Sequence, residues 1–118
     1  MNKFDGILKA SPEKRYKNFI ATVADREEVW MLSNDDGYAS IDDDYINLFV
    51  FPEKEYAEVF CDGEIPVSIN IHDFCDRCSE LDPKSKVRFM VSPNGTNAFV
   101  VDVEKMFNDI TEALDRIE

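Results

Sequence analysis

The segment that decides the fold class is Ile46-Asn-Leu-Phe-Val-Phe51, which Pro52 follows at once. Successive side chains of a strand point to opposite faces of a sheet, so the three aliphatic residues share one face while Phe49 and Phe51 share the other. A strand that is apolar on both faces needs cover on both sides. The segment therefore predicts the middle of a layered domain in which helices pack on a sheet.

Helical and extended patterns alternate around this strand. Apolar spacing, proline and glycine positions, and turn residues such as Asn34-Asp-Asp-Gly37 set the expected boundaries. We expect helices at residues 4–8, 12–25, 52–62, 71–81 and 103–117, and strands at 29–32, 38–41, 46–51, 67–69, 87–91 and 98–101. Ser11, Asn70 and Asp102 are expected to cap the helices that follow them. The order α-α-βββ-α-β-α-ββ-α predicts an α+β fold, a single compact domain over residues 1–118 with a mixed sheet of about six strands.

Composition and net charge argue against several classes of protein. The chain has 118 residues, 44% of them hydrophobic, which suits one globular domain. Thirteen Lys and Arg residues stand against twenty-five Asp and Glu residues, and a net charge of −12 would repel a nucleic-acid backbone. No apolar run approaches the roughly 20 residues that span a bilayer, so we expect no membrane partner. Three cysteines, an odd number, and an N-terminus without a secretory signal predict a cytoplasmic protein with reduced thiols.

The acidic residues are concentrated in residues 25–64, where thirteen acids and two bases give a net charge of −11. If the strands at 29–32, 38–41 and 46–51 form an antiparallel meander, the first strand begins at the sheet end where the second turn lies. We therefore expect one acidic rim of six carboxylates, joined by two more from the end of the following helix. The six are Asp25, Glu27, Glu28, Asp42, Asp43 and Asp44, and the two are Asp62 and Glu64.

The expected rim predicts a binding surface for a basic protein, because a concentrated negative field steers oppositely charged partners. Two other interpretations stay open. Such a charged run can be a solvated face that only keeps the protein soluble. The carboxylates at 42–44 also suit a divalent cation, although an EF-hand loop beginning at Asp42 would place Asn47 where glycine is needed.

His72, Cys75 and Cys78 form a cluster suited to metal binding or redox chemistry, and Cys61 could add a fourth ligand. A structural role is the stronger interpretation of the two cysteines. Cys75 and Cys78 share the helical spacing of the apolar residues around them, whereas His72 points toward the polar side of the same helix. We therefore predict core cysteines, no bound metal and no cofactor. A metal-binding or thiol-redox protein that uses His72, Cys75 and Cys78 is the alternative function.

The sequence carries no recognisable catalytic motif. It has one histidine, and its four glycines are too widely separated for a dinucleotide-binding or phosphate-binding loop. No Gly-x-Ser-x-Gly nucleophile elbow is present either. These observations favour a non-enzymatic protein. Trp30, between Val29 and Met31 in an expected strand, is predicted to be a core residue rather than a ligand platform.

Five segments, in order along most of the chain, form a recognisable pattern. They are Arg15-Tyr-Lys-Asn-Phe-Ile-Ala-Thr-Val-Ala-Asp-Arg-Glu-Glu-Val-Trp30, Asp36-Gly-Tyr-Ala39, Phe51-Pro-Glu-Lys-Glu-Tyr-Ala-Glu58, Val67-Ser-Ile-Asn-Ile-His-Asp-Phe74 and Ser92-Pro-Asn-Gly95. The pattern resembles an uncharacterised bacterial family, domain of unknown function 2750, and the first segment is the most specific. The resemblance implies a compact α+β bacterial domain and no established activity. Cys75, Cys78 and the acids at 42–44 are not part of the pattern.

These observations together favour a small acidic protein that works by binding, as an adaptor or immunity-like module whose partner is a basic protein. Self-association through a sheet edge or an apolar face is a third interpretation. The apolar residues on both faces of the strand at 46–51 motivate it.

Overall fold

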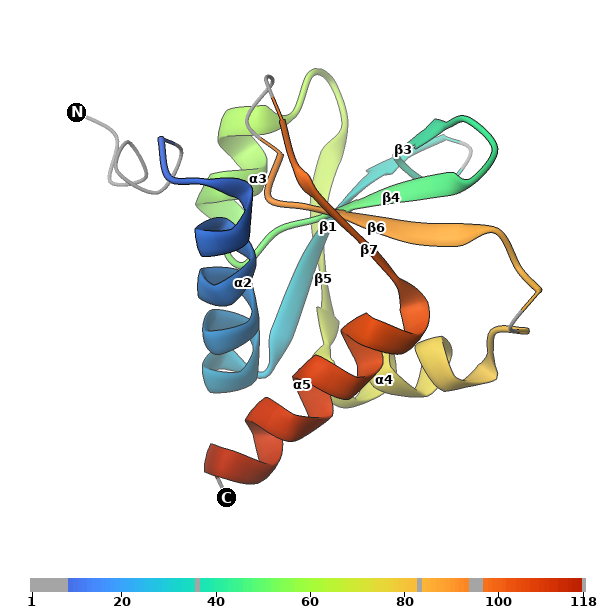
Figure 1. Cartoon of the computed structure of the whole chain (residues 1–118). Helices are drawn as coiled ribbons and strands as arrows, with labels where there is room; N and C mark the ends of the chain where they lie inside the picture. Colours follow the sequence, from blue (N-terminus) through green and yellow to red (C-terminus); the bar gives the residue numbers. More distant parts are fainter. Residues whose placement is uncertain (1–8, 36, 83, 94–96, 118) are drawn as a thin grey trace.

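The strands of the molecule form two sheets. The computed structural model describes residues 9–35, 37–82, 84–93 and 97–117, and within them seven strands are present (Figure 1). The first sheet is antiparallel and has the order β2-β1-β5, with β1 at Glu28–Asn34, β2 at Gly37–Tyr38 and β5 at Ile65–Asn70. The second has the order β3-β4-β6-β7, with β3 at Ser40–Asp42, β4 at Ile46–Val50, β6 at Val87–Val91 and β7 at Phe99–Asp102. It is mixed, because β4 and β6 run parallel while its other neighbours are antiparallel.

The two sheets are joined where β1 approaches β4. Trp30 and Phe51 form an antiparallel bridge, with backbone N–H to carbonyl distances of 3.0 and 2.8 Å. Ala39 makes the second link, since its N–H donates to the Leu32 carbonyl at 2.7 Å and its own carbonyl accepts from Phe49 at 3.4 Å. The return strand that we expected at 38–41 is therefore split. Its first part pairs with β1 and its second part pairs with β4.

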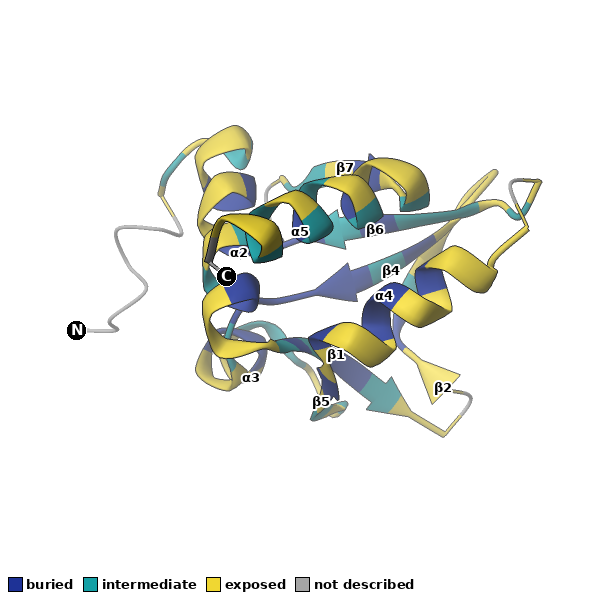
Figure 2. Ribbon diagram, turned by 90° about the horizontal axis from the view of Figure 1, so that it is seen from below, coloured by how far each residue is buried: buried dark blue, intermediate teal, exposed yellow. Residues whose placement is uncertain are grey.

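Four described helices cover the sheets. They are α2 at Pro12–Arg26, α3 at Lys54–Phe60, α4 at Ile71–Glu80 and α5 at Val103–Ile117. The helices α2, α4 and α5 lie on one side of the strands, as the view from below in Figure 2 shows, and α3 packs on the other side. None of these helices is both long enough and apolar enough to cross a bilayer.

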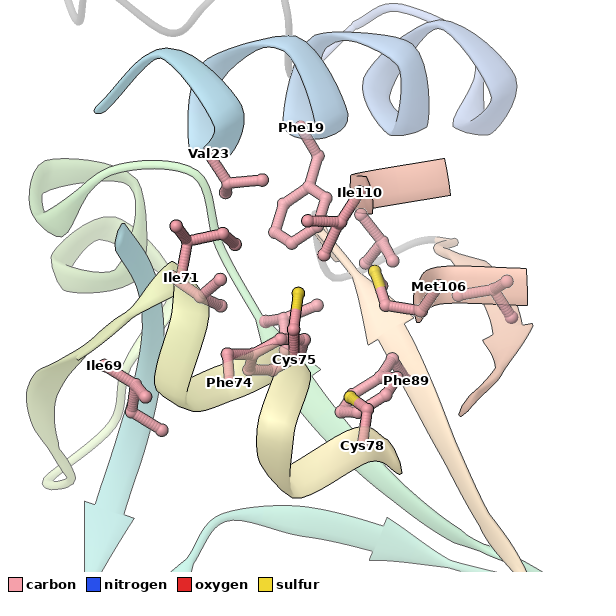
Figure 3. Packing of buried hydrophobic residues seen from close by; sticks show 14 of the residues in the cluster. Phe19, Val23, Ile69, Ile71, Phe74, Cys75, Cys78, Phe89, Met106 and Ile110 are labelled. Atoms are coloured by element: carbon pink, nitrogen blue, oxygen red, sulfur yellow. The ribbon is translucent and has the colours of Figure 1, made fainter. Parts of the chain in front are cut away.

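The hydrophobic core has two parts, one on each side of β4. The larger part joins α2, α4 and α5 to the strands through residues such as Phe19, Phe74 and Met106 (Figure 3). The smaller part lies under α3, where Tyr56 and Ala57 pack on Leu32, Phe49 and Phe51. Each large side chain buried in this way stabilises the fold by about 1.5–3 kcal/mol. The strand at 46–50 is thus covered on both faces, which confirms the prediction from its sequence.

The α+β class and the three helix caps are confirmed. The side chains of Ser11, Asn70 and Asp102 accept from the backbone N–H groups of Lys14, His72 and Lys105 at 3.3, 2.9 and 2.7 Å. Two details differ from expectation. The strands form two sheets of three and four strands instead of one sheet of about six. Pro52 precedes α3 without opening it, because the helix begins at Lys54 after Glu53. The expected helix at 4–8 and the middle of the turn at 92–96 lie outside the described residues.

Candidate functional site

Asp25, Glu27 and Glu28 lie where α2 ends and β1 begins. Glu27 terminates α2 in the left-handed conformation, with φ of 59°, and its carboxylate lies 3.5 Å from Nε2 of His72. Glu28 accepts a hydrogen bond at 3.1 Å from Nε1 of Trp30, whose ring is half-buried beside the smaller core. Two of these three acids are thus held by neighbours at the start of β1.

The acidic run 42–44 lies at the other end of the strands. Because Trp30 and Phe51 pair antiparallel, β1 begins beside the end of β4, whereas 42–44 precede the start of β4. Figure 1 shows this separation, with the end of α2 low on the left and the β3–β4 loop high on the right. The expectation of one acidic rim is therefore wrong. The meander argument fails because the chain leaves β1 at Ala39 and pairs with β4 instead.

Asp62 and Glu64 do not join Glu28 either. They precede Ile65, and Ile65 pairs with Ser33 close to the far end of β1. The helix α3 does run back along the sheet, but β5 then returns antiparallel to β1. The acidic excess of residues 25–64 is consequently divided among separate surfaces of the molecule.

A different set of acids gathers at the end of the four-stranded sheet where β4 and β6 begin and β3 and β7 end. Parallel pairing of β4 with β6 brings the β3–β4 loop beside the segment that follows α4. Because β7 is antiparallel to β6, it ends beside the start of β6, and the first turn of α5 lies there as well. We call this set the acidic end. Its members are Asp42, Asp43, Asp44, Asp82, Asp102 and Glu104.

One member of the acidic end is neutralised by a neighbour. Asp43 accepts from the Tyr45 N–H at 2.7 Å and from Nδ2 of Asn47 at 3.1 Å, and it lies 3.4 Å from the guanidinium of Arg88. These three contacts, the Tyr45 N–H foremost, hold the pKa of Asp43 below its ordinary value. In the part of the chain that the structure describes, none of the other five carboxylates forms an ion pair with Lys or Arg.

A pocket of about 470 Å³ opens at the acidic end, between the end of α4, the start of α5 and the start of β6. Its apolar walls include Leu81, Val87, Val103 and Phe107. Its carboxylates are Asp82, Asp102 and Glu104, and no Lys or Arg is among the described residues that line it. The described lining of the pocket therefore combines an apolar interior with three carboxylates and contains no Lys or Arg.

Exposed apolar side chains surround the acidic end. Ile41, Tyr45, Ile46 and Leu81 are 53, 40, 45 and 38% exposed, and they are four of the eight large hydrophobic residues exposed in the described chain. The Tyr45 ring also lies under the Arg88 guanidinium, 4.1 Å from ring centroid to carbon. Apolar and aromatic groups beside charged ones are typical of surfaces that bind other proteins.

The two cysteines of α4 belong to the core, as predicted. Cys75 and Cys78 are buried on the inward side of α4 and point toward the strands and α5 (Figure 3). Burial raises the pKa of both thiols, that of Cys78 to about 12, so both stay protonated at neutral pH. His72 is exposed on another side of the helix. Among the described residues, no group of three or more His, Cys, Asp or Glu side chains is arranged to hold a metal ion.

A larger groove of about 870 Å³ runs between α2 and α5. Within its lining the Tyr16 hydroxyl donates to Asp109 at 2.5 Å, and Asp109 also lies 3.0 Å from Nζ of Lys105. Burial, followed by the neighbouring Asp109 carboxylate, raises the pKa of Tyr16, so this phenol serves as a hydrogen-bond donor and not as a base. The polar groups of Tyr16, Lys105 and Asp109 in this lining therefore bind one another.

Sequence reasoning missed a buried arginine. Arg15 is 1% exposed, and its guanidinium donates to the carbonyls of Ala10, Ser92 and Asn97 at 2.7, 3.0 and 3.0 Å. The Tyr56 hydroxyl donates to the same Ser92 carbonyl at 3.1 Å. This cluster ties the start of α2 to the segment after β6. One signal in the sequence could have indicated its importance: Arg15 is the first residue of the 15–30 segment, the most specific part of the sequence pattern.

Comparison with other proteins places the chain in a family. No curated protein and no solved structure matches it significantly. The family model described as a protein of unknown function (DUF2750) matches residues 16–110. The matched region runs from the second turn of α2 to the middle of α5 and includes every residue of the acidic end. The chain therefore belongs to the DUF2750 family.

Proposed function

We propose that this protein is a non-enzymatic binding module, an adaptor or immunity-like protein that docks a basic protein on its acidic end. The single observation that carries the proposal is the meeting of six carboxylates from three segments of the chain with four exposed apolar side chains. Carboxylates attract and orient a basic surface. Apolar groups supply the desolvated contact area from which most binding energy comes.

The balance of charge supports binding over mere solubility. Five of the six carboxylates have no cationic partner among the described residues, so their charge is available to another molecule. A surface that served solubility alone would not need Ile41, Tyr45, Ile46 and Leu81 exposed beside those carboxylates.

The second acidic surface, at Asp25, Glu27 and Glu28, is the weaker candidate for the docking site. Glu27 already faces His72, and Glu28 already accepts from Trp30. We keep this surface in the experiment as an alternative site for the same partner.

Three further observations support a binding role in the cytoplasm. The thiols of Cys75 and Cys78 stay protonated at neutral pH, which disfavours thiol chemistry, and the sequence has a single histidine. All three cysteines are free, as expected in a reducing compartment.

Affinity capture from the source cells, followed by binding measurements with the purified prey, tests this proposal. The bait is the full chain, compared with a double variant of the acidic end, Asp42→Lys with Asp44→Lys. The matched control, Asp25→Lys with Glu27→Lys, makes the same change in net charge at the other acidic surface. Circular dichroism confirms that each bait is folded.

We expect a basic prey whose affinity falls at least about tenfold in the Asp42→Lys, Asp44→Lys bait, mainly through a slower association rate. The affinity for the wild-type chain should also weaken as salt rises from about 50 to 500 mM. A loss confined to the control variant would move the docking site to the start of β1, and an equal loss in both variants would show a response to net charge alone. A prey that binds all three baits equally, at every salt concentration, contradicts a charge-guided partner.

A further inference from the structure

We infer that the pocket at the acidic end takes the side chain of a lysine or arginine from the partner. The inference rests on the proposed function, because it names the part of the partner that the acidic end recognises. It is narrower than that function, since a basic protein could also dock on the carboxylates without entering the pocket.

The pocket matches both halves of a basic side chain. Its walls at Leu81, Val87, Val103 and Phe107 can pack against a methylene stem. Its carboxylates at Asp82, Asp102 and Glu104 can receive the charged head, which no cation within the described lining would repel. A volume of about 470 Å³ lies within the range of pockets that enclose small ligand groups, about 300–1,000 Å³.

Two of the carboxylates are held in place before anything binds. Oδ1 of Asp82 accepts from the Lys84 N–H at 2.8 Å, and Oδ1 of Asp102 accepts from the Lys105 N–H at 2.7 Å. Each of these bonds uses one oxygen and fixes the side chain. Oδ2 of each residue has no hydrogen-bond partner within the described chain and is available to a donor. Preorganised acceptors lower the entropy cost of binding.

A basic side chain fits this composition better than a metal ion. A divalent cation such as Ca²⁺ needs six or more oxygen ligands, or several retained waters. Here the walls at Leu81, Val87, Val103 and Phe107 are hydrocarbon, which cannot coordinate a cation but can cover a four-carbon stem. Apolar walls beside carboxylates therefore favour a lysine or arginine side chain, in which a hydrocarbon stem carries an ammonium or guanidinium group.

Nuclear magnetic resonance titration of the full chain tests the pocket directly. The probes are N-acetyl-lysine methylamide and N-acetyl-arginine methylamide, with the norleucine and glutamate analogues as neutral and acidic controls, and Mg²⁺ and Ca²⁺ as separate arms. We expect the two basic probes to shift the amide resonances of Leu81, Ser85 and Glu104, saturating at millimolar concentrations. The norleucine probe should bind at least about fivefold more weakly, and the glutamate probe should cause no shifts there.

Two variants separate this inference from the proposed function. Ser79→Phe fills the pocket without changing any charge, and it should abolish the shifts from the basic probes. Asp102→Asn keeps the cap on α5 but removes one charge, and it should weaken those probes at least about threefold. Saturation by Mg²⁺ or Ca²⁺ with no response to the basic probes would overturn the inference. A purified partner that binds the Asp42→Lys, Asp44→Lys chain more weakly but binds Ser79→Phe as tightly as the wild type would also overturn the inference. In that case the proposed function would stand, but without a basic side chain in the pocket.

Discussion

Arg15 shows how a charged residue can become part of the core. Arginine is rarely buried without a paired charge, so helical spacing alone gives no reason to place Arg15 inside. Its charge is satisfied by carbonyls from Ala10, Ser92 and Asn97, two of which are about 80 positions away in the chain. Contacts at such sequence separation leave no local pattern, which is why this buried cluster could not be predicted while the caps at Ser11, Asn70 and Asp102 could.

Replacing Arg15 should destabilise the whole protein. In Arg15→Lys a single ammonium cannot reach three carbonyls in fork geometry, and the buried acceptors lose their donors. We expect the free energy of unfolding to fall by about 2–4 kcal/mol in urea denaturation followed by circular dichroism. The exposed neighbour provides the control, since Lys14→Arg should change stability by less than about 0.5 kcal/mol. Equal stability of Arg15→Lys and the wild type would show that the buried bonds contribute little.

The thiols give a second test of single residues. Cys75 and Cys78 are buried with raised pKa values, whereas Cys61 is half-buried at the end of α3. Native protein at pH 8 should therefore react slowly at two thiols with an aromatic disulfide reagent, and all three should react fast in denaturant. Between pH 9 and 12 the unfolded chain loses the Cys78 proton while the folded chain keeps it, so stability should fall as the pH rises. Cys78→Ala should show a shallower fall over that range.

At the scale of elements, local patterns predicted the types of the strands better than their partners. The alternation in β4 and the three caps are short-range signals, and both are present in the structure. The pairing of β4 with β6 joins strands separated by two helices and a strand, and nothing in the local sequence specifies it. The switch at Ala39, where one expected strand becomes β2 and β3, has the same origin. The strand that motivated self-association lies inside the sheet, between β3 and β6.

The cap of α4 offers a test at this scale. The Asn70 side chain accepts from the His72 N–H at 2.9 Å, and without it that first-turn donor loses its protein partner. Asn70→Ala should lower the free energy of unfolding by about 1 kcal/mol in chemical denaturation. Asn70→Asp should retain most of the stability, since aspartate also caps helices. If Asn70→Asp lost as much stability as Asn70→Ala, Asn70 would act through its place in β5 and not through the cap of α4.

At the scale of the whole molecule, the sequence located the excess of charge but not its distribution. The net charge of −11 in residues 25–64 is a property of composition and was visible at once. Its division among the start of β1, the acidic end and the segment before β5 depends on strand order. Asp82, Asp102 and Glu104 come from outside that segment, and only the β4–β6 pairing and the return of β7 bring them beside 42–44. Prediction of the acidic end therefore required the fold.

The most direct measurement of the docking claim is hydrogen–deuterium exchange of the chain, free and in complex with its purified partner. We predict slower exchange in the complex at residues 41–47, 81–87 and 102–105, the three segments that form the acidic end and its pocket. Residues 25–28 and the α2–α5 groove should exchange at their free rates. Protection confined to residues 25–28 or to that groove, with unchanged exchange at 41–47 and 81–87, would contradict the account.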